Sequence, residues 1–240
     1  MGKLAAMIGL LLTLLIHPAA AQTACAPYSA PITVDFQTHQ PQPTLNNALN
    51  VTALHNFMGS KGQAPSGGVH SEALGVTYTT PEFNIEANSR IVSRGRGPTC
   101  VYLTKVKVEF GFRDVDVYVA SEYRPGTCEY KAILDHENQH VAINTQALRT
   151  HAPRMRLALE RMLGEERPTV TNDPDRVTQQ ILNRLTRRMD EYLKAFYAEM
   201  DSRNGALDTA SNYEAIGNIC RDWNRGNVWP EERKPPRRVR

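Results

Sequence analysis

The chain has 240 residues, with 28 Lys and Arg against 25 Asp and Glu, which gives a formal net charge of +3. So small a net charge speaks against a protein that binds nucleic acid through a broad basic surface. The length suits one domain with elaborations, large enough to bury a substantial core without help from disulfides.

The first 21 residues have the pattern of a cleavable export signal. Lys3 supplies a positive charge, Leu4 to Ile16 form an apolar run too short to span a bilayer, and three alanines occupy 19–21. The sequence therefore predicts a signal peptide over 1–21. The mature protein is expected to begin near Gln22 and to be periplasmic or secreted.

Four cysteines remain after the predicted cleavage: Cys25, Cys100, Cys128 and Cys220. In an oxidising compartment an even count favours two disulfides, for which three connectivities exist. We favour Cys128 with Cys220 and Cys25 with Cys100, because the first pair would tie the chain end to the start of a predicted helix. No two cysteines are close enough in sequence for a cysteine-based metal site.

Residues 31–118 have the alternation of β-strands. Apolar and polar residues alternate over 32–36 and 106–110, and again over 115–119 after a break at Gly111, while 76–83 can add a further strand. A short helix is expected over 45–58, and a loop over 59–68. This part predicts a small antiparallel sheet.

The pattern changes to a helical period after Gly126. Thr127 is a suitable N-cap, and apolar residues over 130–155 are compatible with one or two helices, interrupted or kinked at Pro153.

A long helix is predicted to begin after Asp173, which can cap it, with Pro174 at its first position. Gly205 can close this helix, and a shorter helix is expected over 211–220. One apolar stripe runs along the long helix: Val177, Ile181, Leu185, Met189, Leu193, Phe196 and Met200.

His136, Glu137 and His140 form an H-E-x-x-H motif within the first of these helices. Residues four apart share one helix face, so both imidazoles can bind a single ion. Glu137 lies one position round from His136 and can approach a water on that ion without ligating it. The motif predicts Zn²⁺ bound by His136 and His140, with Glu137 as general base.

A catalytic zinc site needs a third protein ligand from elsewhere in the chain. A metzincin would have glycine and histidine where this sequence has Ile143 and Gln146, so that class is excluded. His151 lies eleven residues after His140 on the same helical region and cannot easily fold back, so we expect it to be exposed.

The remaining candidates for third ligand are acidic: Glu199, Asp201, Asp208 and Glu214. Glu199 and Asp201 lie at opposite margins of the apolar stripe, so periodicity alone does not choose between them. Asp208 also suits an N-cap or turn before the last helix. Tyr192, Tyr197 and Tyr213 could supply an oxyanion donor, but each reads as a packing aromatic and none is assigned.

The run YKAILDHENQHVAI, followed some sixty residues later by AEMDSRNGALDT, resembles a family of bacterial secreted proteins described as zinc-dependent proteases of the gluzincin type. The likeness covers roughly 118–220. It implies Glu199 as third ligand and Asp201 as a carboxylate that orients a histidine, with Asp208 as a further candidate. The chain departs from gluzincins because the two acids in AEMD are separated by one residue, which is closer than usual.

The sequence as a whole predicts an α+β, zincin-like domain over 22–220, in which the small sheet packs on the H-E-x-x-H helix and a long C-terminal helix delivers the third ligand. The expected function is hydrolysis of peptide bonds in a peptide, a protein or the cell-wall peptide. The alternative is a non-catalytic envelope protein with a structural zinc or no metal. The tail over 221–240 is basic and could contact an anionic envelope surface.

Overall fold

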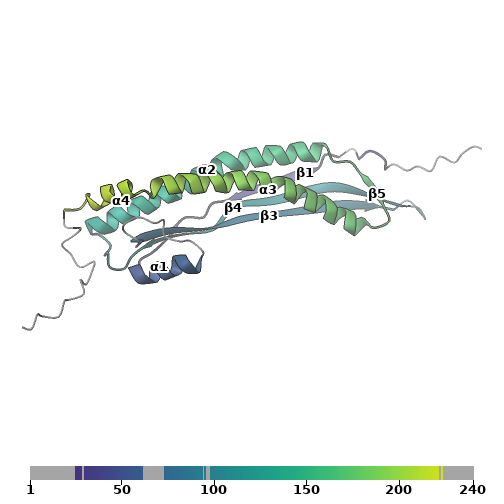
Figure 1. The fold of residues 1–240 in the computed structure, drawn as a ribbon. Helices are drawn as coiled ribbons and strands as arrows, with labels where there is room; N and C mark the ends of the chain where they lie inside the picture. Colours follow the sequence, from purple (N-terminus) through teal and green to yellow (C-terminus); the bar gives the residue numbers. More distant parts are fainter. Residues whose placement is uncertain are drawn as a thin grey trace, which may run out of the picture.

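The fold combines one five-stranded sheet with two long helices that lie along it, as the computed structural model shows (Figure 1). It describes residues 25–28, 30–61, 73–93, 95, 98–221 and 223. The predicted signal peptide lies outside this part, and so does most of the predicted tail, residues 222 and 224–240. The strands are β1 (Thr33–His39), β2 (Thr44–Asn46), β3 (Gly75–Val92), β4 (Thr99–Val119) and β5 (Thr169–Thr171), and the helices are α1 (Val51–Ser60), α2 (Cys128–Gly164), α3 (Pro174–Leu207) and α4 (Ala210–Gly217).

The sheet is built around β4. Antiparallel β3 pairs with β4 along its whole length, from Gly75 opposite Val119 to Val92 opposite Cys100. The other edge of β4 is shared by antiparallel β5 and by β1 and β2, which both run parallel to β4. The α+β class is confirmed, but the sheet is mixed rather than antiparallel. Alternation along one strand carries no information about the direction of its neighbour, which explains the difference.

The expected break at Gly111 is wrong, because β4 continues through this residue. Gly111 has a φ of +148°, and a Cβ atom there would lie 2.0 Å from the carbonyl oxygen of His39 in β1. Glycine is therefore needed for close approach of the neighbouring strand rather than for a turn.

Helix α2 is a single helix of 37 residues that begins at the predicted cap, with the Thr127 side chain accepting from the backbone N–H of Tyr130. Pro153 lies inside the helix without interrupting it. A proline removes one helical hydrogen bond. Here Ala152 and Met155, on either side of it, are buried against the rest of the protein and hold the helix together.

Helix α3 confirms the predicted start, with Asp173 as N-cap and Pro174 in the first turn. It does not close at Gly205 and instead runs to Leu207, with Asp208 as its C-cap residue. The apolar stripe of α3 is buried as expected, and Phe196 packs edge-on against Phe110 of β4 with ring centroids 4.9 Å apart. The last helix, α4, covers 210–217.

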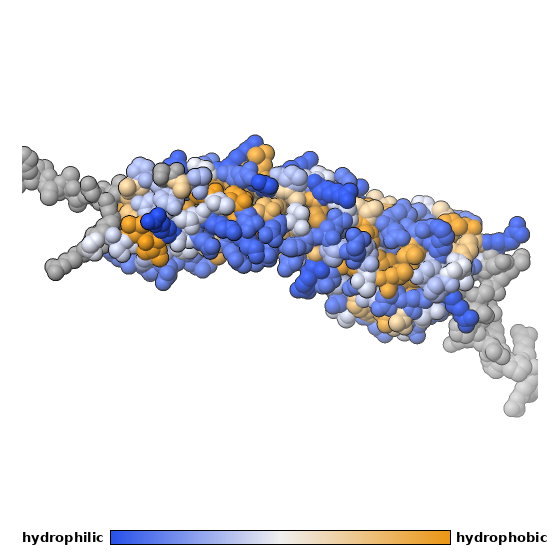
Figure 2. Space-filling model, turned by 180° about the vertical axis from the view of Figure 1, so that it is seen from behind, coloured by the Kyte–Doolittle hydropathy of each residue, from blue (hydrophilic) through white to orange (hydrophobic). Residues whose placement is uncertain are grey.

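Two hydrophobic clusters hold the layers together. The larger lies between α2, α3 and the sheet, and the smaller lies where α1 covers one end of β3 and β4 beside the first turns of α2. Phe57 of α1 contacts the rings of Tyr78 and Tyr118 there. Seen from behind, hydrophilic residues cover the middle of the elongated molecule and hydrophobic residues gather toward its ends (Figure 2).

Both favoured disulfides are confirmed: Cys25 is bonded to Cys100, and Cys128 to Cys220. Two disulfides indicate an oxidising, extracytoplasmic environment, in agreement with the predicted export. Among the described residues, none of the helices is long and apolar enough to cross a membrane.

Candidate metal centre

Helices α2 and α3 lie side by side (Figure 1). Polar side chains from the two helices meet between them. The helices are antiparallel, so residues further along α2 meet residues earlier in α3: His136 contacts Asp208, His140 contacts Asn204 and Asp208, and Asn144 contacts Asn204. Spacing by four residues places each set on one face of its helix. The four-residue spacing in each helix thus brings the polar residues together where α2 and α3 pack.

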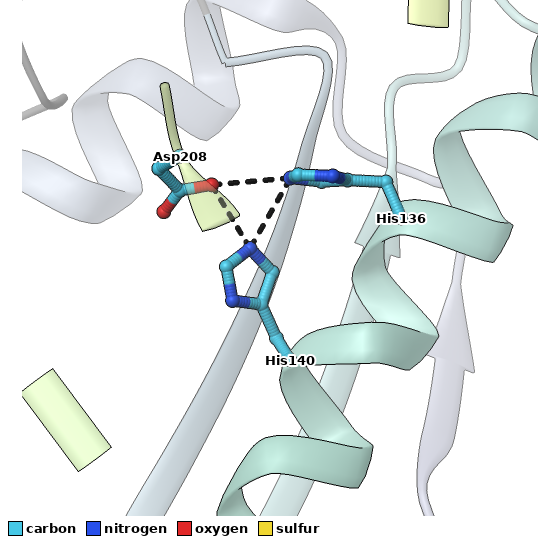
Figure 3. Close-up of side chains that lie close together, drawn as sticks. All are labelled: His136, His140 and Asp208. Carbon is cyan, nitrogen blue, oxygen red and sulfur yellow. Dashed lines mark hydrogen bonds and ion pairs between the residues drawn. The ribbon is translucent and has the colours of Figure 1, made fainter. Parts of the chain in front are cut away.

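Three side-chain atoms converge at the centre of this group (Figure 3). The Nε2 atoms of His136 and His140 lie 3.2 Å apart, and Asp208 Oδ1 lies 3.1 Å from the first and 3.0 Å from the second. His136 and His140 are buried, whereas the Asp208 side chain keeps 21% of its surface exposed. The group is therefore open to solvent on the Asp208 side.

A chain of amides orients His140. Its Nδ1 lies 2.9 Å from Asn204 Oδ1, and Asn204 in turn donates through Nδ2 to Asn144 Oδ1, also at 2.9 Å. Because an amide oxygen can only accept, the Nδ1 of His140 carries a proton that it donates. Once its Nε2 has lost its proton, the neutral ring can present the Nε2 lone pair to a metal ion.

The Asp208 carboxylate and the two histidines favour a positive charge between them. Burial would raise the pKa of Asp208, but hydrogen bonds with His136 and His140 hold it well below the usual range. Burial would lower the pKa of His140, whereas the hydrogen bond to Asp208 and the charge of Glu137 raise it to about 8. Without a metal, a proton on His140 supplies this positive charge.

Glu137 points to the sheet side of α2. Its Oε2 accepts a hydrogen bond of 2.8 Å from the Thr77 hydroxyl of β3, and a Cβ atom on Gly75 would lie only 2.7 Å from its Oε1. Burial raises the pKa of Glu137, against the opposing charges of His140 and His136. A glutamate with a raised pKa is suited to accept and return a proton near neutral pH.

Tyr213 of α4 lies beside the group on its exposed side. Its hydroxyl donates to Asp208 Oδ1 at 2.9 Å, and its ring lies 5.4 Å from that of His136. Burial, and then the charge of Asp208, raise the pKa of Tyr213, so the hydroxyl stays protonated and acts as a donor. This residue is the one tyrosine of the three considered from sequence that contacts the group.

The three convergent atoms fit a small divalent cation. A tetrahedral ion with bonds of about 2.0–2.1 Å separates its ligand atoms by roughly 3.3–3.4 Å, and the observed separations are 3.0, 3.1 and 3.2 Å. Two imidazole nitrogens and a carboxylate oxygen suit first-row divalent metals, zinc among them. His136, His140 and Asp208 could therefore hold a metal ion through three protein ligands.

The structure places Glu199, the preferred third ligand, away from this group. Its Oε2 lies 3.0 Å from Nε2 of His151, eleven residues or about 16 Å along α2 from His140. Asp208, one of the alternatives, stands beside the histidines instead. Asp201 is exposed on α3. The expectation that His151 is exposed is wrong, because it is buried and packs against Phe196.

Sequence reasoning missed the supporting residues Asn204, Asn144 and Thr77, and it considered Tyr213 without assigning it a role. A signal existed for the first, because continuing the α3 stripe four residues beyond Met200 reaches Asn204, and four more reach Asp208. Polar residues at core positions of a helix are unusual and need partners. No comparable signal marks Thr77 or Tyr213, whose roles depend on how β3 and α4 pack on α2.

Comparisons of the chain with protein-family models, with curated proteins and with solved structures returned no match. The case for a metal centre therefore depends on the geometry of the group itself.

Proposed function

We propose that the protein is a secreted zinc-dependent hydrolase that cleaves peptide bonds. The observation that carries this proposal is the convergence of His136 Nε2, His140 Nε2 and Asp208 Oδ1 beside a buried Glu137. Catalytic zinc sites have three protein ligands and an open position, whereas structural sites are closed by four. Among the described residues, three such groups converge here.

Each residue of the group has a role in the proposed reaction. A zinc ion held by His136, His140 and Asp208 would polarise the scissile carbonyl and make a water molecule acidic enough to attack it. Glu137 would take the proton from the attacking water and pass it to the leaving amine. Thr77 holds the Glu137 carboxylate, and Asn204 holds the His140 ring, so both keep their orientation between turnovers.

A substrate would approach from the side where Asp208 and Tyr213 are exposed. A separate open hollow borders the first two turns of α2, and it is lined by Gly126, Thr127, Cys128, Tyr130, Lys131 and Leu134. A peptide, a protein or the cell-wall peptide of the envelope would each supply the amide bond that this chemistry needs. The resemblance to secreted zinc-dependent proteases supports the same reaction.

The test is zinc content together with hydrolysis of an unfolded protein such as casein. Wild type and Glu137→Gln are expected to bind one zinc per chain, whereas Asp208→Asn and His140→Ala lose it, and Glu137→Gln abolishes cleavage. Glu199→Gln is the matched control. It changes an acidic residue of α3 that lies away from the centre, and it should leave zinc content and cleavage unchanged. If wild type and Glu137→Gln bind the same amount of zinc and neither cleaves the substrate, the result would instead identify a structural site.

A further inference from the structure

Helix α4 carries part of the metal centre but is weakly attached to the rest of the protein. It begins at Ala210, two residues after Asp208, and contains Tyr213, yet none of its residues is buried. Within the described part of the chain, the hydrogen bonds of residues 209–219 stay inside this stretch or return to Leu207 and Asp208. A segment with so little buried surface opens easily unless something else fixes it.

The Cys128–Cys220 disulfide supplies that fixation. Cys220 follows α4 and is buried, and its partner Cys128 is the first residue of α2, with Cα atoms 5.9 Å apart. Cys128 lies eight residues before His136 on the same helix, or about 12 Å along its axis. The bond therefore fastens the end of α4 to the helix that carries both histidines.

Residues 208–220 thus form a strap with two anchors. At one end, Asp208 continues from α3, whose Met200 is buried in the main core. At the other end, the strap is bonded to the start of α2. The first anchor is itself part of the centre, the second lies about 12 Å along α2 from His136, and the strap between them carries Tyr213.

We propose that the Cys128–Cys220 disulfide is a positioning element of the metal centre, which holds Asp208 and Tyr213 against His136 and His140. Metal affinity then depends on this bond being intact. The inference rests on the metal binding of the proposed function, though not on its catalytic step. Without the bond, the strap keeps its α3 anchor and, beyond Cys220, the ring contact of Trp223 with Tyr123. Asp208 at the end of α3 is then held less firmly against the histidines.

The second disulfide offers a matched control within the same chain. Cys100 lies near the start of β4, whereas Thr77, which contacts Glu137, pairs with Val117 near the end of this strand. Seventeen residues of extended strand span about 57 Å. The Cys25–Cys100 bond is therefore remote from the metal centre, although its loss should also destabilise the fold.

The test compares metal binding in wild type, Cys128→Ser/Cys220→Ser and Cys25→Ser/Cys100→Ser, with serine used so that no free thiol binds metal. Zinc affinity is measured by competition with a chelator, and site geometry by the visible absorption of bound Co²⁺. We expect the Cys128/Cys220 variant to lose at least about tenfold in affinity, the scale on which ligand-orienting groups act, and to change the cobalt spectrum. The Cys25/Cys100 variant should keep both within twofold, even though both variants melt at lower temperature.

Equal affinities and identical cobalt spectra in the two folded double variants would overturn the positioning role. If the Cys128/Cys220 variant does not fold, the oxidised wild type loaded with zinc is reduced stepwise, alkylated and mapped by mass spectrometry. Zinc should then leave in step with alkylation of Cys128 and Cys220, and its retention after their modification overturns the inference. A wild type that binds zinc no better than His140→Ala refutes the metal centre itself, which is a separate outcome.

Discussion

Gly75 provides a sharp test of how Glu137 is held, because this first residue of β3 lies directly against α2. A Cβ atom there would lie 2.6 Å from Ile133 Cγ2, 2.7 Å from Glu137 Oε1 and 2.9 Å from Glu137 Cγ. Carbon atoms in contact are about 3.5–4.0 Å apart, so Gly75→Ala must push these side chains away by about 1 Å. Gly75 is not among the glycines with positive φ, so the substitution adds bulk without backbone strain.

The expected cost is that of overpacking, roughly 1–3 kcal/mol in the free energy of unfolding. For a chain of this size each kcal/mol lowers the melting temperature by about 2–4 °C. Displacement of a reacting group by 1 Å can cost about 100-fold in rate, so cleavage should fall on that scale while zinc affinity stays unchanged, because Glu137 is not a ligand. Thermal unfolding by circular dichroism, zinc titration and the casein assay measure the three effects.

The control is Gly59→Ala in α1, where a Cβ atom would meet nothing within 4 Å. Alanine is favoured over glycine in a helix by about 0.5–1 kcal/mol, so this variant should be as stable as wild type or slightly more stable. If Gly75→Ala melts and cleaves like wild type, Glu137 does not pack against β3 as described and the reasoning is refuted.

Three further predictions concern the surroundings of the centre. Asn204→Ala removes the acceptor for His140 Nδ1 and should weaken zinc binding by about 10- to 100-fold, and an unchanged dissociation constant would show that the ring needs no such support. Thr77→Val removes the hydroxyl that donates to Glu137 and should lower the rate of cleavage without altering zinc content, so a loss of zinc would contradict the assigned role. Zinc affinity should rise by about tenfold per pH unit and level off near pH 8. The reason is that the proton on His140, with its pKa raised to about 8, must leave before Nε2 binds metal. A flat profile between pH 6 and 8 in zinc titrations would refute this competition.

Local patterns were sufficient for the features that depend on neighbours along the chain. Thr127 and Asp173 cap their helices as predicted because a short polar side chain satisfies free N–H groups within three residues of it. The buried face of α3 follows from its 3.6-residue period. The H-E-x-x-H motif is likewise local, since one helix presents both histidines to one point and turns Glu137 aside.

The mixed direction of the sheet and the unbroken course of β4 could not be predicted in this way. The backbone of β1 passes so close to Gly111 that only glycine fits, yet from sequence alone that glycine indicated a break. The structural role of Gly111 depends on β1, a strand more than 70 positions away in the sequence.

The third candidate metal ligand shows the same difference between what the sequence specifies and what the tertiary structure specifies. The sequence by itself determined that two histidines and a glutamate share a helix, and it left four acidic residues of later segments as candidate partners. Only the tertiary structure decided between Glu199 and Asp208, because the antiparallel contact of α2 and α3 places Glu199 on His151 and Asp208 between His136 and His140. Helical periodicity specifies which face a side chain occupies, whereas the offset between two packed helices depends on how their cores interlock and on where α3 ends.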